Sequence, residues 1–325
     1  MLPHACLAAL GAALLATTLT ACDNAPQQPP PAAAPSAPAS PAPVTTPLWR
    51  EFSGEKALAE ARSQFDIGPR PAGSKELAQC RELITRSLTA SGWEVEEQAF
   101  TNETPRGPVR FVNLVARCSA VPGNKPARDT QRAIVCSHYD TKRFSTIRFA
   151  GANDGASSSG ALVELARVLA LRPSLAARVE LVFFDGEEAF VQFTETDGLY
   201  GSRHYARSLR EASRAGQFTY AILWDMIGDK DLTITLSPDS PQPLTAEVLA
   251  SAKELKLHSY FSYFDRPILD DHVPLNQARI PSIDLIDFDY LPWHTADDTF
   301  DKLSPESLRK VGAITLHHLE RTISK

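Results

Sequence analysis

Hydrophobic residues along this chain fall into two patterns: short continuous apolar runs, and longer stretches with helical periodicity. Four runs predict buried strands, at Arg132 to Tyr139, Arg178 to Phe184, Tyr220 to Ile227 and Ser282 to Phe288. Helical stretches alternate with them at residues 156–171, 201–210, 244–255 and 305–321. Such alternation is typical of a parallel sheet. The pattern therefore predicts an α/β fold, doubly wound, with a mainly parallel, mixed sheet and helices on both faces.

The region before these strands predicts one helix and two further strands. Ser74 can cap a helix over residues 75 to 90, and Gly92 ends it. Trp93 to Phe100 and Phe111 to Cys118 alternate between apolar and polar residues, as strands do. We expect the folded part of the chain to be one domain, residues 48–325.

The N-terminal region predicts export and a tether. Leu7 to Thr18 is apolar but too short to span a bilayer, and Leu19-Thr20-Ala21-Cys22 follows it as a small-residue cleavage site. This pattern predicts a lipoprotein-type signal peptide, residues 1–22, with an ordinary secretory signal as the alternative because the first residues lack Lys and Arg. Residues 23–47 hold nine prolines among Ala, Ser and Thr, which predicts a disordered linker. We expect a bacterial cell-envelope protein facing the periplasm, anchored only through lipidated Cys22.

Composition and charge narrow the function classes. The hydrophobic fraction of 43% is ordinary for a globular protein. The net charge of −6 gives no basic footprint for nucleic acid or for an anionic membrane surface. Cys6 would leave with the signal peptide and Cys22 would carry lipid, so three cysteines remain. An oxidising compartment permits one disulfide among these three. We expect Cys118 to pair with Cys136, leaving Cys80 free.

Acidic and histidine residues follow the apolar runs at five points in the sequence. They are His138 and Asp140, Asp154, Glu187-Glu188, Asp225 and His294. In an open α/β sheet, ligands bind beyond the carboxyl ends of the strands, so these side chains can converge. Carboxylates and a neutral imidazole suit Zn²⁺, which leaves one position for water or substrate in catalytic sites. Adjacent glutamates can divide the work: one binds metal while the other moves protons.

The same motifs resemble a known family. The stretches that carry the resemblance are Ser137 to Lys142, Gly151 to Asp154, Ala161 to Leu169, Phe183 to Phe190, Leu199 to His204, Leu223 to Gly228, Asp270 to Pro274 and Trp293-His294-Thr295. They resemble the zinc aminopeptidase superfamily and, within it, the glutaminyl cyclases, which form N-terminal pyroglutamate. The resemblance covers nearly all of the predicted folded domain.

Peptidases and cyclases of this superfamily share a fold, and the ligand inventory does not separate them. A dinuclear peptidase needs five ligands, and His138, Asp154, Glu188, Asp225 and His294 supply all of them. The spacing favours the cyclases, because the segment Ala189 to Asp197 separates the paired glutamates from Gly198-Leu199-Tyr200-Gly201-Ser202. Trp293 before the last His and the Asp270-Asp271-His272 motif also resemble the cyclases.

The resemblance implies a role for each site residue. Asp154, Glu188 and His294 would hold one zinc ion per chain, and Glu187 would be the proton carrier. Asp225 and Asp270 would hydrogen-bond the reacting groups. The pocket would be lined, or supported from behind, by Trp293, Phe193, His138 and Asp284. In a mononuclear site His138 and Asp225 would orient the metal ligands, whereas in a dinuclear site they would bind metal.

Two positions depart from the animal-type cyclases. Asp284 stands where those enzymes have a His, and Phe193 stands where they have a Trp. Asp284 resembles some bacterial members, but it could equally be an ordinary carboxylate at a strand end. Lys142, Arg148 and His272 lie near the motifs, yet charged side chains are mostly exposed, so we assign them no catalytic contact.

The sequence thus predicts a zinc-dependent glutaminyl cyclase that acts on peptides or proteins with an N-terminal Gln and is a monomer. Two rivals remain. A dinuclear zinc aminopeptidase would release N-terminal residues, and metal content per chain separates it from the cyclase. A tethered substrate-binding lipoprotein would have lost catalytic positions, whereas here every expected position is occupied.

Overall fold

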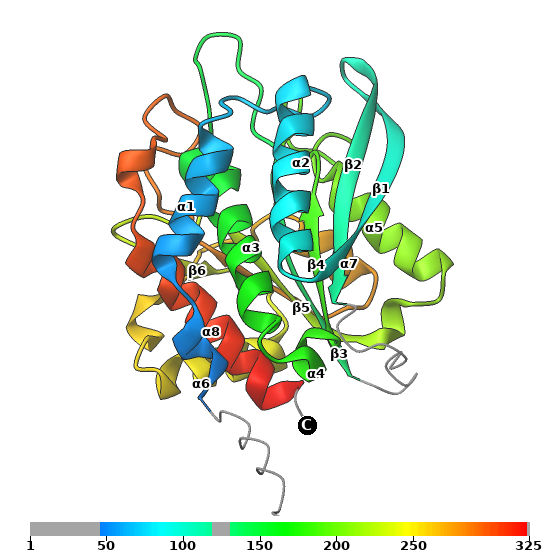
Figure 1. The fold of residues 1–325 in the computed structure, drawn as a ribbon. Coiled ribbons are helices and arrows are strands. Elements are labelled where there is room, and N and C mark those ends of the chain that lie inside the picture. Colours follow the sequence, from blue (N-terminus) through cyan, green and yellow to red (C-terminus); the bar gives the residue numbers. More distant parts are fainter. Residues whose placement is uncertain (1–45, 119–130, 324–325) are drawn as a thin grey trace, which may run out of the picture. The chain divides into compact units, whose positions relative to one another are not determined.

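The computed structural model describes residues 46–118 and 131–323 (Figure 1). The predicted signal peptide, its Cys22 and nearly all of the predicted linker lie outside the described residues. No helix in the described ranges is long and apolar enough to cross a membrane.

Helices and strands alternate through most of the described chain. In order they are η1 (Leu48–Glu51), α1 (Gly54–Phe65), α2 (Lys75–Ala90), β1 (Trp93–Thr104), β2 (Gly107–Cys118), β3 (Arg132–His138), η2 (Ala152–Ser157), α3 (Ser158–Leu169), α4 (Pro173–Ala176), β4 (Val179–Phe184), α5 (Tyr200–Glu211), η3 (Ala215–Gln217), β5 (Phe218–Asp225), β6 (Ile234–Leu236), α6 (Gln242–Glu254), η4 (His258–Tyr260), β7 (Phe261–Tyr263), α7 (His272–Gln277), β8 (Ser282–Ile286), η5 (Phe300–Lys302) and α8 (Pro305–Thr322).

The strands form one mixed sheet of eight, in the order β1-β2-β4-β3-β5-β8-β6-β7. The central strands β4, β3, β5 and β8 are parallel to one another. Antiparallel pairs occur toward the edges, where β1 pairs with β2, β2 with β4, and β6 with β8. The predicted fold class, a doubly wound and mainly parallel mixed sheet, is confirmed.

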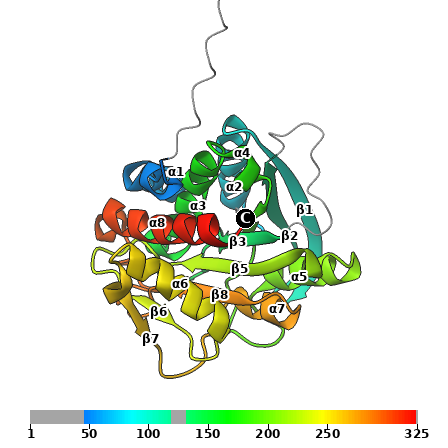
Figure 2. The ribbon, with the colours of Figure 1, turned by 90° about the horizontal axis from the view of Figure 1, so that it is seen from below.

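Alternate residues of the central strands face two hydrophobic cores. In β3, Val135 packs into the core under α1, α3 and α8, whereas Ile134 and Cys136 pack into the core under α5 and α7. Figure 2 shows these two groups of helices on opposite faces of the sheet. Burial on both faces explains why β4, Val-Glu-Leu-Val-Phe-Phe, is an almost continuous apolar run.

The expected disulfide between Cys118 and Cys136 is wrong: both cysteines, and Cys80, are free thiols. The strand order explains the error, because β4 lies between β2, which ends at Cys118, and β3, which carries Cys136. Two strand spacings amount to about 10 Å. Disulfide formation requires Cα atoms within about 7 Å.

Candidate active site at the strand ends

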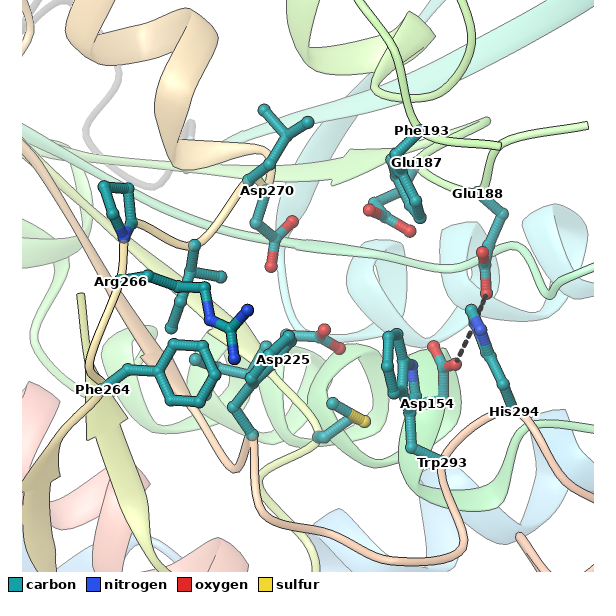
Figure 3. A pocket seen from close by; sticks show the side chains of 16 residues that line it. Asp154, Glu187, Glu188, Phe193, Asp225, Phe264, Arg266, Asp270, Trp293 and His294 are labelled. Atoms are coloured by element: carbon teal, nitrogen blue, oxygen red, sulfur yellow. Dashed lines mark hydrogen bonds and ion pairs between the residues drawn. The ribbon is translucent and has the colours of Figure 1, made fainter. Parts of the chain in front are cut away.

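The predicted site residues converge beyond the carboxyl ends of the central strands, around a pocket of about 420 Å³ (Figure 3). One part of its lining is acidic and includes Asp154, Glu187, Glu188, Asp225 and Asp270. The remainder is mainly apolar and includes Phe193, Met226, Phe264, Ile286, Phe288 and Trp293. Such a lining, apolar with a few convergent polar groups, is typical of a small-molecule or substrate site.

Asp154 is held in a tight turn between β3 and α3 that depends on two glycines. Gly151 and Gly155 have φ values of 55° and 90°. A Cβ atom on Gly155 would lie 2.6 Å from the Asp140 carbonyl oxygen, and one on Gly151 would lie 2.2 Å from that of Asp154. Larger residues therefore do not fit, which explains the Gly-Ala-Asn-Asp-Gly sequence.

Asp298 supports this turn, although no sequence pattern indicates it. Its Oδ1 accepts a hydrogen bond from the Asn153 amide at 2.8 Å, and its Oδ2 accepts one from the Asp154 amide at 3.2 Å. The hydroxyl of Tyr290 donates to Oδ1 at 2.9 Å. Asp298 is buried and fixes the backbone of Asp154, although 144 residues separate them.

Asp154, Glu188 and His294 form the first of two histidine–carboxylate clusters. The Nε2 atom of His294 lies 3.0 Å from Glu188 Oε1 and 3.3 Å from Asp154 Oδ2. One ligand atom from each residue lies within 4.8 Å of the other two. Asp154 Oδ2 and Glu188 Oε2 are buried without a hydrogen-bond partner. Two incompletely satisfied carboxylates and an imidazole at this spacing fit a divalent metal such as zinc.

The backbone of His294 adopts a left-handed conformation, with φ of 55°. A non-glycine residue rarely does so unless its surroundings hold it there, and such strain is concentrated at functional sites. The Trp293 ring stacks on the imidazole at 4.3 Å, and Phe144 and Phe149 contact its edges. Burial opposes protonation, but hydrogen bonds to Asp154 and Glu188 raise the pKa of His294 to about 10. The cluster therefore attracts positive charge strongly.

Glu187 and Glu188 follow β4 and point into the pocket. Asp140 holds this segment, because its two oxygens accept the amides of Glu187 at 3.2 Å and Glu188 at 3.4 Å. Burial, followed by the charges of Glu188 and Asp270, raises the pKa of Glu187 well above its ordinary value. A carboxyl of this kind can hold a proton near neutral pH, as a general acid–base must.

His138, Asp154 and Asp225 form the second cluster, which shares Asp154 with the first. The Nε2 atom of His138 lies 3.2 Å from Asp225 and 3.3 Å from Asp154, and its Nδ1 lies 3.4 Å from Asp140. Only 1% of the His138 side chain is exposed. His138 is not part of the pocket lining, but it contacts two residues that are, Asp154 and Asp225.

Asp270 and Asp284 occupy different positions. Asp270 lines the pocket and is buried. Asp284 is fully buried in β8 and is not part of the pocket lining; its Oδ2 lies 3.6 Å from Nδ1 of His272. Burial and the neighbouring acids Asp284 and Asp225 raise the pKa of Asp270 well above its ordinary value.

Three basic residues near the site were not assigned a role from the sequence. Lys142 Nζ lies 3.5 Å from Glu188 Oε2 and contacts the ring of Phe193. Arg266 lines the pocket and packs against Phe264. Arg70 is fully buried and donates to the carbonyls of Tyr139 at 2.9 Å and Ala150 at 2.7 Å.

Arg70 thus joins the two ends of the loop that leads to Asp154. Its only sequence signal is its place between Pro69 and Pro71. Arg266 lies on a loop that carries no strand-end motif, so periodicity could not place it at the pocket.

Comparison with known proteins places this geometry in a family. Residues 113–319 match the model of peptidase family M28. The chain is 30% identical to a glutaminyl-peptide cyclotransferase-like protein of Bos taurus, over 85% of this chain and 73% of the relative. It is 28% identical to the glutaminyl-peptide cyclotransferase of Drosophila melanogaster, over 80% of this chain and 79% of the relative. Its fold is similar to the crystal structure of an Acidobacteriales bacterium glutaminyl cyclase, with a TM-score of 0.75 and 30% identity, covering 90% of this chain and 99% of that one.

Proposed function

Since the chain belongs to peptidase family M28 and, within it, to the glutaminyl cyclases, we propose that it converts the N-terminal Gln of peptides and proteins to pyroglutamate and releases ammonia. One observation carries this proposal. The Asp154–Glu188–His294 cluster and the buried acid Glu187 face one pocket, in a chain that resembles cyclases along most of its length.

Asp154, Glu188 and His294 would hold one zinc ion. Asp154 Oδ2 and Glu188 Oε2, which make no hydrogen bond, and the nearby His294 nitrogen support this assignment. When bound, zinc supplies a Lewis acid for the γ-carbonyl of the substrate Gln. The two carboxylates balance the metal charge, so the site can accept a neutral amide.

Glu187 would carry the proton. The substrate's own α-amine attacks the γ-carbonyl carbon, so no protein nucleophile is required. Glu187 takes a proton from the attacking amine and passes it to the departing ammonia as the amide C–N bond breaks. Its raised pKa supports both halves of this transfer.

Asp225 and Asp270 would hydrogen-bond the reacting amine and the leaving group, because both line the pocket with Glu187. Trp293 and Phe193 would form the walls that hold the Gln side chain. Positioning amine and amide in a ring-closing geometry supplies much of the rate acceleration in intramolecular reactions.

Peptides with an N-terminal Gln test this function directly. The purified protein should convert Gln-Ala to the pyroglutamyl peptide with one ammonia released, detected by mass spectrometry. An N-acetylated Gln-Ala peptide should not react, because its α-amine is blocked. Release of free N-terminal amino acids from these or other peptides would instead support the aminopeptidase alternative.

For the N-terminal segment, we propose a lipidated Cys22 that anchors the enzyme to the bacterial envelope on the periplasmic side, as a monomer. The small residues before Cys22 and the proline-rich stretch after it support the proposal. Cys22→Ser should leave catalysis intact and move the protein from the membrane fraction to the soluble fraction or to an uncleaved precursor. A wild-type protein found wholly in the soluble periplasm, with a mature N-terminus elsewhere, would contradict it.

A further inference from the structure

A second hollow, of about 550 Å³, lies beside the active site and is lined by four arginines. They are Arg81 on α2, Arg106 in the β1–β2 turn, Arg110 in β2, and Arg143 in the loop after β3. We call this hollow the arginine pocket. In Figure 1 the start of α2 and the β1–β2 turn lie at the upper end of the molecule.

The charges in the arginine pocket are poorly compensated. Arg81 pairs with Glu97 at 3.2 Å, and Arg143 donates to the carbonyl of Ala72 at 3.4 Å. Within residues 46–118 and 131–323, the guanidinium groups of Arg106 and Arg110 make no hydrogen bond or ion pair. The first turn of the sixteen-residue helix α2 also faces the hollow through Ser74, adding the positive end of a helix dipole.

Asp185 is the one acidic residue that the described structure places in the lining of the arginine pocket; its carboxyl interacts electrostatically with Arg81 and Arg110 but forms an ion pair with neither. It is 1% exposed; its Oδ2 accepts from the Val112 amide at 2.7 Å, while its Oδ1 is buried with no partner. Burial, and then the charge of Asp140, raises the pKa of Asp185 well above its ordinary value. One acid against four arginines leaves the lining of the arginine pocket with an excess of positive charge.

The arginine pocket and the active-site pocket share a dividing wall. Arg143 lines the arginine pocket, and its neighbour Lys142 contacts Glu188 of the active site. Phe190 lines the arginine pocket, whereas Phe193 of the same segment lines the active-site pocket. A peptide chain that leaves the active site over this wall therefore enters a positively charged hollow.

We propose that the arginine pocket binds an anionic group, carboxylate or phosphate, carried by the substrate chain downstream of its N-terminal Gln. This inference rests on the proposed cyclase function and names a preferred class of its substrates, peptides with acidic residues after the first few positions. Planar guanidinium groups suit carboxylate and phosphate oxygens. General charge attraction does not explain such a preference, because the whole chain carries a net charge of −6.

Kinetics on matched peptides test the proposal. A series with N-terminal Gln, an alanine spacer and two Glu residues is compared with the same series carrying two Gln residues. For the best spacer length, KM should be about fivefold lower for the acidic peptide at low salt, the effect of about one exposed ion pair. The kcat should be unchanged, since the arginines do not contact the reacting groups.

Charge reversal locates the effect. The double variant R106E/R110E should lose the KM advantage of the acidic peptide. It should cyclise Gln-Ala at the wild-type rate, because this dipeptide is too short to reach the arginine pocket. Arg86→Glu is the matched control, because Arg86 is exposed on α2 but does not line the arginine pocket, and it should retain the advantage. Normal turnover of Gln-Ala also shows that the double variant folds.

Calorimetric titration with inorganic phosphate and with the acidic peptide separates the possible sources of the anion. Phosphate binding without any KM advantage for acidic peptides would overturn the substrate proposal in favour of a free anion. Equal KM values and no phosphate binding would overturn the site altogether. If Gln-Ala is not cyclised by the wild type, the proposed function fails, and binding of the acidic peptide in the titration still reports on the arginine pocket.

Discussion

The two histidine–carboxylate clusters meet at Asp154 but differ in how their histidines are surrounded. The His294 side chain is 21% exposed at the rim of the pocket, and its Nε2 faces two carboxylates. His138 is 1% exposed; its Nε2 lies against Asp225 and Asp154, and its Nδ1 lies 3.4 Å from Asp140 without a hydrogen bond. The cluster with His294 is open toward the pocket, whereas the histidine of the other cluster is enclosed by protein. We infer that the cluster with His294 holds the metal and that the cluster with His138 orients its ligands.

Removal of His294 should have the largest effect on zinc binding and activity. His294→Ala deletes one of three ligands, so zinc affinity should fall by more than the roughly 100-fold typical of residues beyond the ligands, and activity should be lost. Metal analysis after dialysis and a pyroglutamate assay measure both. A variant that retains zinc and turnover would remove the first cluster from the mechanism.

Glu187 should affect turnover without affecting the metal. Glu187→Gln keeps the shape of the side chain but cannot carry the proton, so kcat should fall by about 10²–10⁴-fold with zinc retained. Glu195→Gln, an exposed glutamate eight residues further on, is the control and should behave as wild type. Loss of zinc from Glu187→Gln would mean that the roles of Glu187 and Glu188 are exchanged.

His138 tests the second cluster. His138→Gln should keep one zinc per chain but weaken its affinity or lower activity by about 10–100-fold, because the imidazole no longer holds Asp154 and Asp225 in place. The measurement is zinc content at saturating metal together with a zinc titration. If this variant binds fewer zinc ions than the wild type at saturation, His138 is a ligand.

Asp298 should produce the smallest change. Asp298→Asn replaces one carboxylate oxygen, which accepts a backbone amide, by an NH₂ group, which cannot accept it. The turn that carries Asp154 should loosen, and zinc affinity should fall by about 10-fold. Asp297→Asn changes the exposed neighbouring residue and should leave affinity unchanged. Equal affinities in both variants would show that the turn is held by its glycines alone.

Much of the fold could be predicted because local signals agreed with tertiary structure. The helix predicted over residues 75–90 is observed as α2, with the Ser74 hydroxyl accepting the Leu77 amide. The short strands β6 and β7 were missed, since three residues each are too few to show a period. The six-residue helix α7 was missed for the same reason.

The site was predicted where it follows strand ends and missed where it depends on long-range contacts. Asp154, Glu187 and Asp225 follow apolar runs, and the topology brings them together. Asp298 and Arg70 act through backbone groups far away in sequence, which no local pattern reveals. Asp284 lies in the middle of β8 and is buried outside the pocket lining, whereas Asp225 ends β5 and lines the pocket, so a carboxylate within an apolar run does not by itself indicate a lining residue.

The number and position of the zinc ions decide between the two clusters most directly. Zinc content of the purified protein, combined with anomalous diffraction at the zinc edge, should show one ion per chain, bound by Asp154, Glu188 and His294. His138 should remain hydrogen-bonded to carboxylates and make no metal contact. A second tightly bound zinc between His138, Asp154 and Asp225, accompanied by hydrolysis of N-terminal residues, would contradict the cyclase and support a dinuclear peptidase.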